Sequence, residues 1–303
     1  MCGGWRTVEA EGRRQRRRCV SDSSLFRPVT RFSAQVDTPE SIGEVVANAF
    51  RAAETGRRGA AFVSLPQDVT AGPASGEPVT PVHPPKSGPA AEDAIAEAAA
   101  LISRAENPVL LLGMMASRPE AAVAVRALIR AVPLPVVSTF QANGVVPREN
   151  LASFGGRVGL FHNQPADQLL DAADMVVTIG FNPIEYDPVL WNAGRDRAIV
   201  HIDSVIADYD THYAPTVEVY GDIAATLADL GGKLDVAEIA PNPLIGAVRA
   251  ELEEMRTAGA AKTGMPVHPL RIVKELEALM SDDVVVALDM GSFHIWIARY
   301  LYA

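Results

Sequence analysis

Short, nearly continuous apolar runs alternate along this chain with longer segments whose apolar residues recur every three or four positions. Runs of the first kind are typical of strands buried on both faces of a parallel sheet, and segments of the second kind are typical of helices. The predicted strands are residues 108–112, 135–138, 175–179, 198–202 and 217–220. The predicted helices are residues 93–104, 118–130, 163–172 and 223–230. The alternation predicts an α/β fold with a doubly wound parallel sheet over residues 93–232.

The pattern differs on the N-terminal side of this block. Residues 1–24 contain a run of arginines and no apolar periodicity, which favours a disordered or spurious tail. A nucleic-acid arm or a localisation signal is the alternative for this tail. Residues 25–69 contain one helical stripe followed by a strand, and residues 70–92 form a linker rich in Pro, Gly and Ser.

On the C-terminal side, residues 233–269 are typical of a helical connector, and residues 270–303 begin a further α/β unit. In that unit, the apolar residues 284–288 predict a buried parallel strand. The strand is followed by a turn at Met290, Gly291 and Ser292 and then by an aromatic-rich helix. A helix that starts directly after a strand directs free backbone N–H groups towards the edge of the sheet. This turn therefore predicts an anion site, most often one for phosphate.

Composition narrows the function classes. The net charge is −10, but residues 1–31 hold eight Arg against three acidic residues, so the rest of the chain carries −15. The strongly negative charge of residues 32–303 argues against a nucleic-acid partner. No apolar run is long enough to cross a membrane. Cys2 and Cys19 are the only cysteines, which excludes a disulfide framework, and the chain is predicted to be soluble and cytoplasmic.

Several candidate ligand positions follow the predicted strands, at the sheet edge where open α/β sheets bind ligands. They are Gly113, Gly180, Phe181, Asp203 and Asp222. The glycines would admit a ligand close to the backbone, and the carboxylates would accept ribose hydroxyls, which together predict a nucleotide cleft. The alternative is that every such sheet needs turn glycines and capping aspartates. No G-x-G-x-x-G fingerprint is present.

Arg157 is a further candidate for this cleft. Three glycines surround it, at positions 155, 156 and 159, which predicts a loop that offers a guanidinium group to an anion.

Five strings make the chain resemble the acetolactate synthases, a family of thiamine-diphosphate enzymes, and specifically their catabolic branch. The strings are FRAAE at 50–54, FVSLPQDV at 62–69, GRVGLF at 156–161, IEYDP at 184–188 and DMGSFHIWIARY at 289–300. The biosynthetic, FAD-containing branch has Gly-Gln-His-Gln where this chain has residues 291–294. That branch also has a substrate-binding Arg where this chain places Tyr186. Both departures favour the catabolic branch, which does not require FAD.

The resemblance implies three domains. Residues 25–69 would be the C-terminal remnant of a pyrimidine-binding domain, residues 93–232 a whole central domain, and residues 270–303 the start of a diphosphate-binding domain. The family's catalytic Glu would lie in an N-terminal part outside this chain. The Mg²⁺-binding motif would lie beyond Ala303. The resemblance therefore gives this chain no catalytic residue and no metal ligand.

The family turn that contacts thiamine diphosphate matches Met290, Gly291, Ser292 and Phe293. The parent enzyme would be a transferase that condenses two pyruvates, with Mg²⁺ on the cofactor, as a homo-oligomer. The isolated chain is expected to be inactive. Two alternatives remain open. The chain could be a non-catalytic module that binds a nucleotide or flavin, or a partner subunit that docks on full-length chains.

Overall fold

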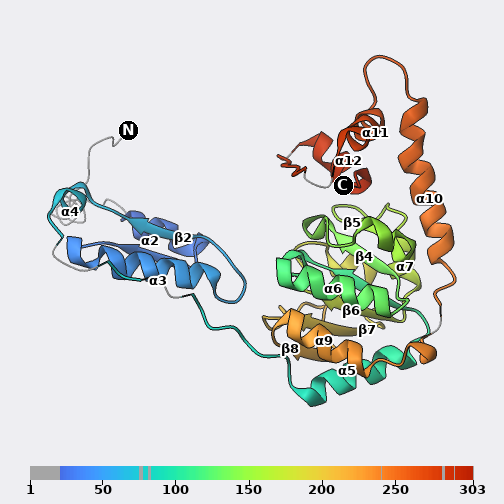
Figure 1. Cartoon of the computed structure of the whole chain (residues 1–303), viewed down its shortest axis with the longest axis horizontal. Coiled ribbons are helices and arrows are strands. Elements are labelled where there is room, and N and C mark those ends of the chain that lie inside the picture. The colour runs from blue at the N-terminus through green and yellow to red at the C-terminus, as the bar shows by residue number, and fades with distance from the viewer. Residues whose placement is uncertain are drawn as a thin grey trace. The chain divides into compact units, whose positions relative to one another are not determined.

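The computed structural model describes residues 21–74, 78–80, 83–239, 241–281, 284–289 and 291–302 (Figure 1). The chain divides into two compact units between Lys86 and Ser87, a boundary that lies inside the predicted linker 70–92. Residues 1–20 of the predicted tail lie outside the described residues. A short helix, α2 (Asp22–Phe26), begins two residues before the predicted end of that tail.

The first unit is small. Two parallel strands, β1 (Phe32–Gln35) and β2 (Ala61–Ser64), pair in register and pack against the amphipathic helix α3 (Ile42–Glu54). The short helix α4 (Gln67–Ala71) follows β2, and 3₁₀ turns cover Arg27–Val29 and Pro39–Ser41. Among its described residues, the buried apolar side chains are Val36, Ala49, Pro66 and Val69. This unit therefore has little hydrophobic core of its own.

The second unit is built around a six-stranded parallel sheet. Its strands are β3 (Pro108–Leu112), β4 (Val136–Thr139), β5 (Phe154–Val158), β6 (Met175–Ile179), β7 (Ala198–Asp203) and β8 (Val217–Tyr220). Its helices are α5 (Glu92–Arg104), α6 (Pro119–Ala131), α7 (Asp167–Ala172), α8 (Pro188–Trp191), α9 (Ile223–Lys233), α10 (Ile245–Thr257), α11 (Pro269–Leu279) and α12 (Ser292–Tyr300). Shorter 3₁₀ turns cover Met114–Ser117, Phe140–Ala142, Arg148–Ser153, Val236–Glu238 and Ala258–Ala261.

The strand order is β5-β4-β3-β6-β7-β8, and every neighbouring pair is parallel. The chain runs outward to one edge through β4 and β5, then returns to pair β6 with β3. Helices cover both faces, because α5, α6 and α9 pack in one buried cluster and α7, α8 and α10 contribute to another. The predicted doubly wound parallel sheet is confirmed.

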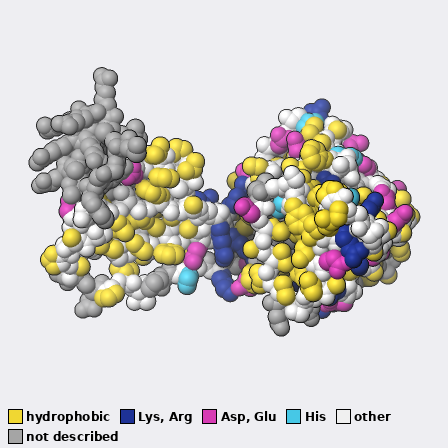
Figure 2. All heavy atoms as spheres, turned by 90° about the horizontal axis from the view of Figure 1, so that it is seen from above, with side chains coloured by type: hydrophobic (Ala, Val, Ile, Leu, Met, Phe, Trp, Pro, Cys, Tyr) yellow, Lys and Arg dark blue, Asp and Glu magenta, His cyan; other side chains and the backbone are white. Residues whose placement is uncertain are grey.

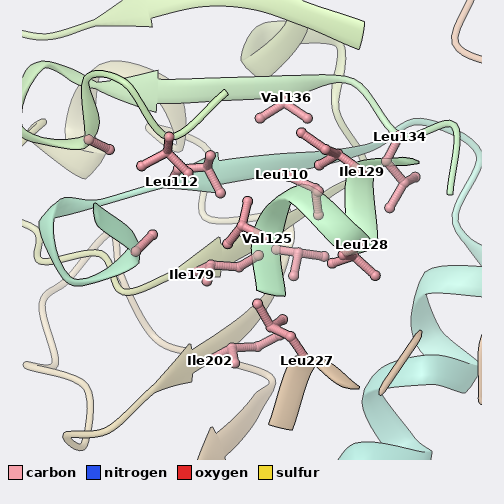
Figure 3. Close-up of a cluster of buried hydrophobic side chains, with 14 of the residues drawn as sticks. Leu110, Leu112, Val125, Leu128, Ile129, Leu134, Val136, Ile179, Ile202 and Leu227 are labelled. Atoms are coloured by element: carbon pink, nitrogen blue, oxygen red, sulfur yellow. The ribbon is translucent and has the colours of Figure 1, made fainter. Parts of the chain in front are cut away.

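The core between the sheet and the α6–α9 layer is continuous and apolar (Figure 3). Leu110 on the central strand β3 lies against Leu128 and Ile129 of α6, and Ile202 of β7 lies near Leu227 of α9. These side chains are at most 4% exposed. Close packing of this kind fixes the sheet rigidly, so the loops at its carboxyl edge start from well-defined positions.

Two predictions of local structure are wrong. Residues 155–161 were expected to form a loop, but Phe154–Val158 form the edge strand β5, because pairing with β4 outweighs the low strand propensity of two glycines. Residues 284–288 were expected to form a buried strand. They have no strand pairing among the described residues, and Val285 is 92% exposed. A strand needs a hydrogen-bonded neighbour, and none of the described strands pairs with this segment.

Apolar side chains also reach the surface of both units (Figure 2). Examples on the second unit are Leu160, Phe161, Ile184 and Ile206, each more than half exposed. Among the described residues, no helix is both long and apolar enough to span a membrane.

Candidate functional site at the carboxyl edge of the sheet

The sheet has one topological switch point, between β3 and β6, where the strand order reverses direction. Ligands of open α/β proteins bind beyond the carboxyl ends of the strands at such a point. Gly113 directly follows β3 and Gly180 directly follows β6, so both predicted glycines lie at the switch point. Asp203 ends β7, and Asp222 lies two residues after β8. The structure therefore places these four residues along one edge of the sheet.

The two glycines are required by protein packing. A Cβ atom on Gly113 would lie 2.3 Å from the Cα of Phe181. Gly180 has a φ of +61°, and its Cβ would lie 2.4 Å from the backbone nitrogen of Ala116. The two turns are further joined by a 2.9 Å hydrogen bond from the Met115 N–H to the Gly180 carbonyl. Backbone therefore fills the space that a ligand was expected to approach.

The other three candidates of the cleft also have roles within the protein. Phe181 is 1% exposed and packs against Trp191 and Tyr213. Asp203 is buried and accepts a 2.6 Å hydrogen bond from the N–H of Ser204. Asp222 is the N-cap of α9, where its carboxylate accepts from the Ala225 N–H at 2.9 Å. The nucleotide cleft stays a prediction, and the alternative of turn glycines and capping aspartates accounts for these contacts.

Arg157 lies away from these residues. It is on β5, four strands from Asp203 on β7, which at about 4.8 Å per strand is roughly 19 Å. Its guanidinium is buried, and Nη1 donates a 2.8 Å hydrogen bond to the Leu301 carbonyl just after α12. Burial lowers the pKa of Arg157, although arginine stays charged. The structure thus joins Arg157 to the C-terminal segment.

Sequence reasoning missed Glu185, which occupies the switch point. Its carboxylate accepts from the backbone N–H of Met114 at 2.9 Å and from that of Asn182 at 3.0 Å. It also accepts from the Thr139 hydroxyl at 2.7 Å, so one side chain ties the ends of β3, β4 and β6 together. The string IEYDP contains this residue, but no periodicity or motif marks it. Only the tertiary arrangement of three strand ends explains its role.

Replacing Glu185 with alanine is expected to lower the free energy of unfolding of the second unit by about 2 kcal/mol. The reason is that two backbone N–H groups and a hydroxyl lose a charged acceptor. Chemical denaturation of the chain and of E185A measures the difference. E185Q keeps the shape of the side chain and should lose less. Equal losses in E185A and E185Q would show that only the charge matters and the shape of the side chain does not, and an unchanged stability in E185A would contradict the role given to Glu185.

The turn that precedes α12 lies beside the carboxyl ends of β4 and β5. His294 in the first turn of α12 packs edge-on against Phe140, which directly follows β4, at 6.2 Å between ring centroids. The Phe140 ring in turn lies over Gly159, the residue after β5. Gly291 has extended backbone, and Phe293 is partly exposed. Met290 lies outside the described residues. The predicted cofactor turn is thus held close to the sheet edge.

The loop after β5 is held by a buried polar chain. Gln164 accepts from the Gly159 N–H at 3.0 Å through its side-chain oxygen and donates to the Phe161 carbonyl. The backbone N–H of Gln164 donates to the Asp167 carboxylate at 2.7 Å. The same carboxylate accepts from the hydroxyl of the buried Tyr186 at 2.6 Å. These bonds hold a loop in which Leu160 has a φ of +65°. Tyr186 therefore supports this loop from the core.

Asp167 makes this loop sensitive to pH. Burial raises the pKa of Asp167 above its ordinary value of 3.8, because desolvation outweighs the hydrogen bond from Tyr186. Since the folded state then binds the proton more tightly than the unfolded state, the contribution of Asp167 to stability decreases as the pH rises above about 4. Asp167→Asn should remove that dependence.

The test is urea denaturation of the chain and of D167N between pH 4 and 7. The stability of the unsubstituted chain is expected to fall relative to D167N as the pH increases. Parallel curves would contradict the raised pKa. Glu97→Gln is the matched control, because Glu97 is an exposed carboxylate on α5, away from this loop.

Among the described residues, no three His, Cys, Asp or Glu side chains are grouped so as to hold a metal ion. Cys2 and Cys19 lie outside the described ranges.

Comparison with known proteins assigns this architecture. Residues 95–230 match the family described as the thiamine pyrophosphate enzyme, central domain. The chain is 43% identical over 296 residues to acetolactate synthase of Bacillus subtilis (strain 168). The aligned residues make up 97% of this chain and 52% of that protein. It is 42% identical over 284 residues to the catabolic acetolactate synthase of Raoultella terrigena, covering 92% of this chain and 50% of the relative. The identity to the acetolactate synthase isozyme 1 large subunit of Escherichia coli (strain K12) is 26% over 286 residues, covering 92% of this chain and 49% of that protein.

The six-stranded sheet of the second unit, with its switch point, is thus the central domain of a thiamine pyrophosphate enzyme. Within that class, the acetolactate synthases of Bacillus subtilis and Raoultella terrigena are similar to this chain along nearly its whole length. The chain spans about half the length of the curated relatives it matches.

Proposed function

We propose that this chain is part of a catabolic acetolactate synthase. The parent reaction would join two pyruvates and release CO₂ to give 2-acetolactate. The observation that carries the proposal is the contrast in identity, which is 42% to the catabolic enzyme of Raoultella terrigena and 26% to the isozyme 1 large subunit of Escherichia coli. Tyr186 adds to it, because its hydrogen bond to Asp167 gives this position a packing role in place of the biosynthetic branch's Arg.

The residues of this chain make only one part of a thiamine diphosphate site. The start of α12, at Gly291, Ser292 and Phe293, presents the N-terminal end of a nine-residue helix, which suits a phosphate group. Such an end contributes about 0.3–1 kcal/mol for each interaction with an anion. Two buried or half-buried carboxylates of this region have other partners, since Glu185 binds the strand ends and Asp167 lies beneath the β5 loop. The described residues around the start of α12 therefore do not fit a complete site for thiamine diphosphate and Mg²⁺.

The proposal predicts that the isolated chain does not form acetolactate from pyruvate with thiamine diphosphate and Mg²⁺. The Bacillus subtilis relative, assayed in parallel, is the positive control. Turnover by the isolated chain above the blank would contradict the prediction of inactivity and would show that its own residues complete a site. Size measurement of the chain, alone and mixed with a full-length relative, tests the homo-oligomer that we propose for the complete enzyme.

The alternative of a free-standing nucleotide- or flavin-binding module is not favoured. The similarity extends over 97% of the chain to a single enzyme family, well beyond the central domain. The packing of Gly113 against Phe181 also leaves backbone where the nucleotide was expected.

A further inference from the structure

We propose that Asn143 is a site of spontaneous deamidation, at which the backbone nitrogen of Gly144 attacks the side-chain amide. The two residues follow the 3₁₀ turn Phe140–Ala142 in the connection between β4 and β5. They are the only Asn-Gly pair in the sequence. The inference concerns the covalent chemistry of the chain itself and does not depend on the proposed activity.

The backbone of Asn143 and Gly144 forms the middle of a type II turn. The N–H of Val145 donates to the Ala142 carbonyl at 3.4 Å, which closes the turn. Asn143 has a φ of −57° and a ψ of 141°, and Gly144 has a φ of +80°. Such a turn needs glycine at its third residue, and glycine has no side chain to obstruct an attack by its own nitrogen.

The peptide group between these two residues is free to rotate. Among the described residues, neither the Asn143 carbonyl nor the Gly144 N–H has a hydrogen-bond partner, and the exposed Asn143 side chain has none either. The next two carbonyls are held, because Arg126 donates to that of Gly144 at 2.8 Å and to that of Val145 at 2.9 Å. Rotation about ψ of Asn143 therefore breaks no hydrogen bond of this peptide group while it brings the Gly144 nitrogen to the side-chain amide.

The reaction balances with water as the only co-reactant. The Gly144 nitrogen bonds to the Cγ carbon of Asn143, the Cγ–Nδ2 bond breaks, and the leaving –NH₂ group takes up the proton of the Gly144 N–H and departs as ammonia. Water then opens the cyclic imide at either carbonyl, which gives aspartate or isoaspartate. The side chain gains one negative charge, so the net charge of the chain goes from −10 to −11.

A second exposed asparagine, Asn163, shows how the fold prevents the same reaction. The backbone N–H that follows it, that of Gln164, donates to the Asp167 carboxylate at 2.7 Å. The side-chain oxygen of Asn163 accepts from Nη2 of Arg299 at 3.0 Å. An attack at Asn163 would have to break both hydrogen bonds. Asn182 lacks the nucleophile altogether, because it precedes a proline, whose nitrogen carries no proton.

Deamidation of Asn143 would change the wall of a cavity. Asn143 and Gly144 line this cavity together with the exposed Arg148. A carboxylate in place of the amide puts an anion on the same wall as the arginine, and isoaspartate adds one carbon to the main chain of the connection. The modified chain therefore differs from the original in both charge and backbone.

The test incubates the full chain in mildly alkaline buffer made with heavy-oxygen water and then maps its peptides by mass spectrometry. The peptide that holds Asn143 is expected to gain the mass difference between –NH₂ and a heavy-oxygen –OH, and to contain both aspartate and isoaspartate. The heavy label separates this reaction from any that occurs during digestion in ordinary water. Peptides that hold Asn163 and Asn182 should stay unchanged over the same time. An unchanged Asn143, or a product without isoaspartate, would overturn the proposal.

The substitution Ala193→Gly is the matched control, because it places a glycine directly after Asn192. Asn192 is 3% exposed, and its Nδ2 donates to the His212 carbonyl at 2.8 Å. In folded A193G, Asn143 is expected to convert at least about tenfold faster than Asn192, which is a difference of about 1.4 kcal/mol in barrier height. In urea the two should convert at similar rates. Equal rates in the folded variant would overturn the claim that the fold selects Asn143, and the comparison with Asn163 decides if A193G does not fold.

Discussion

Replacing Gly113 with alanine is expected to destabilise the second unit by about 3 kcal/mol. The added Cβ would lie 2.3 Å from the Cα of Phe181 and 2.5 Å from the Gly180 carbonyl oxygen. Both neighbours are backbone atoms and neither can rotate away, so the turns after β3 and β6 must separate. That separation would also strain the hydrogen bond from the Gly113 N–H to the Ile179 carbonyl. Guanidinium denaturation followed by circular dichroism measures the loss.

Gly232→Ala is the matched control for this substitution. Gly232 lies inside α9, and a Cβ at this position would meet nothing within 4 Å. Alanine there should stabilise the protein by about 0.5–1 kcal/mol, because it has the higher helix propensity. A loss for G113A of the same size as ordinary surface substitutions would show that the two turns are not in contact.

Replacing Leu110 with alanine is expected to cost about 3 kcal/mol of unfolding free energy. Leu110 lies on the central strand β3, pairs with Val136 and Val177, and is 1% exposed. Close packing against α6 prevents the site from collapsing around the smaller side chain (Figure 3). Leu279→Ala is the control, because Leu279 is 80% exposed and its truncation should change stability by less than about 0.5 kcal/mol. Similar losses at the two positions would contradict the packing described for the sheet.

The class of fold was predictable because its strands are buried on both faces. Residues 108–112 are apolar without interruption, residues 175–179 are apolar except for Thr178, and both strands were placed correctly from sequence. Strand β5 was missed because Gly155 and Gly156 give no apolar signal. Its formation depends on pairing with β4, where the register shifts between Val136 and Val137. Strand pairing of this kind is a tertiary effect that a local pattern does not contain.

The positions of the candidate site were easier to predict than its contacts. Gly113, Gly180 and Asp222 do lie at the carboxyl edge, because strand ends set that edge. What each residue contacts depends on neighbours far away in sequence. Phe181 is buried against Trp191, and Glu185 joins three strand ends that the sequence separates by tens of residues. Burial of Arg157 by the segment after α12 could not be seen in a glycine-rich string.

We propose that residues 93–232 can serve as the central domain of a catabolic acetolactate synthase. The most direct measurement is the activity of a chimera in which these residues replace the matching segment of the Bacillus subtilis enzyme. We predict that the folded chimera forms acetolactate from pyruvate with thiamine diphosphate and Mg²⁺, and that G113A lowers the thermal stability of the chimera and its resistance to loss of activity on heating together. A chimera that has the circular dichroism and size of the parent enzyme but forms no acetolactate would contradict the claim.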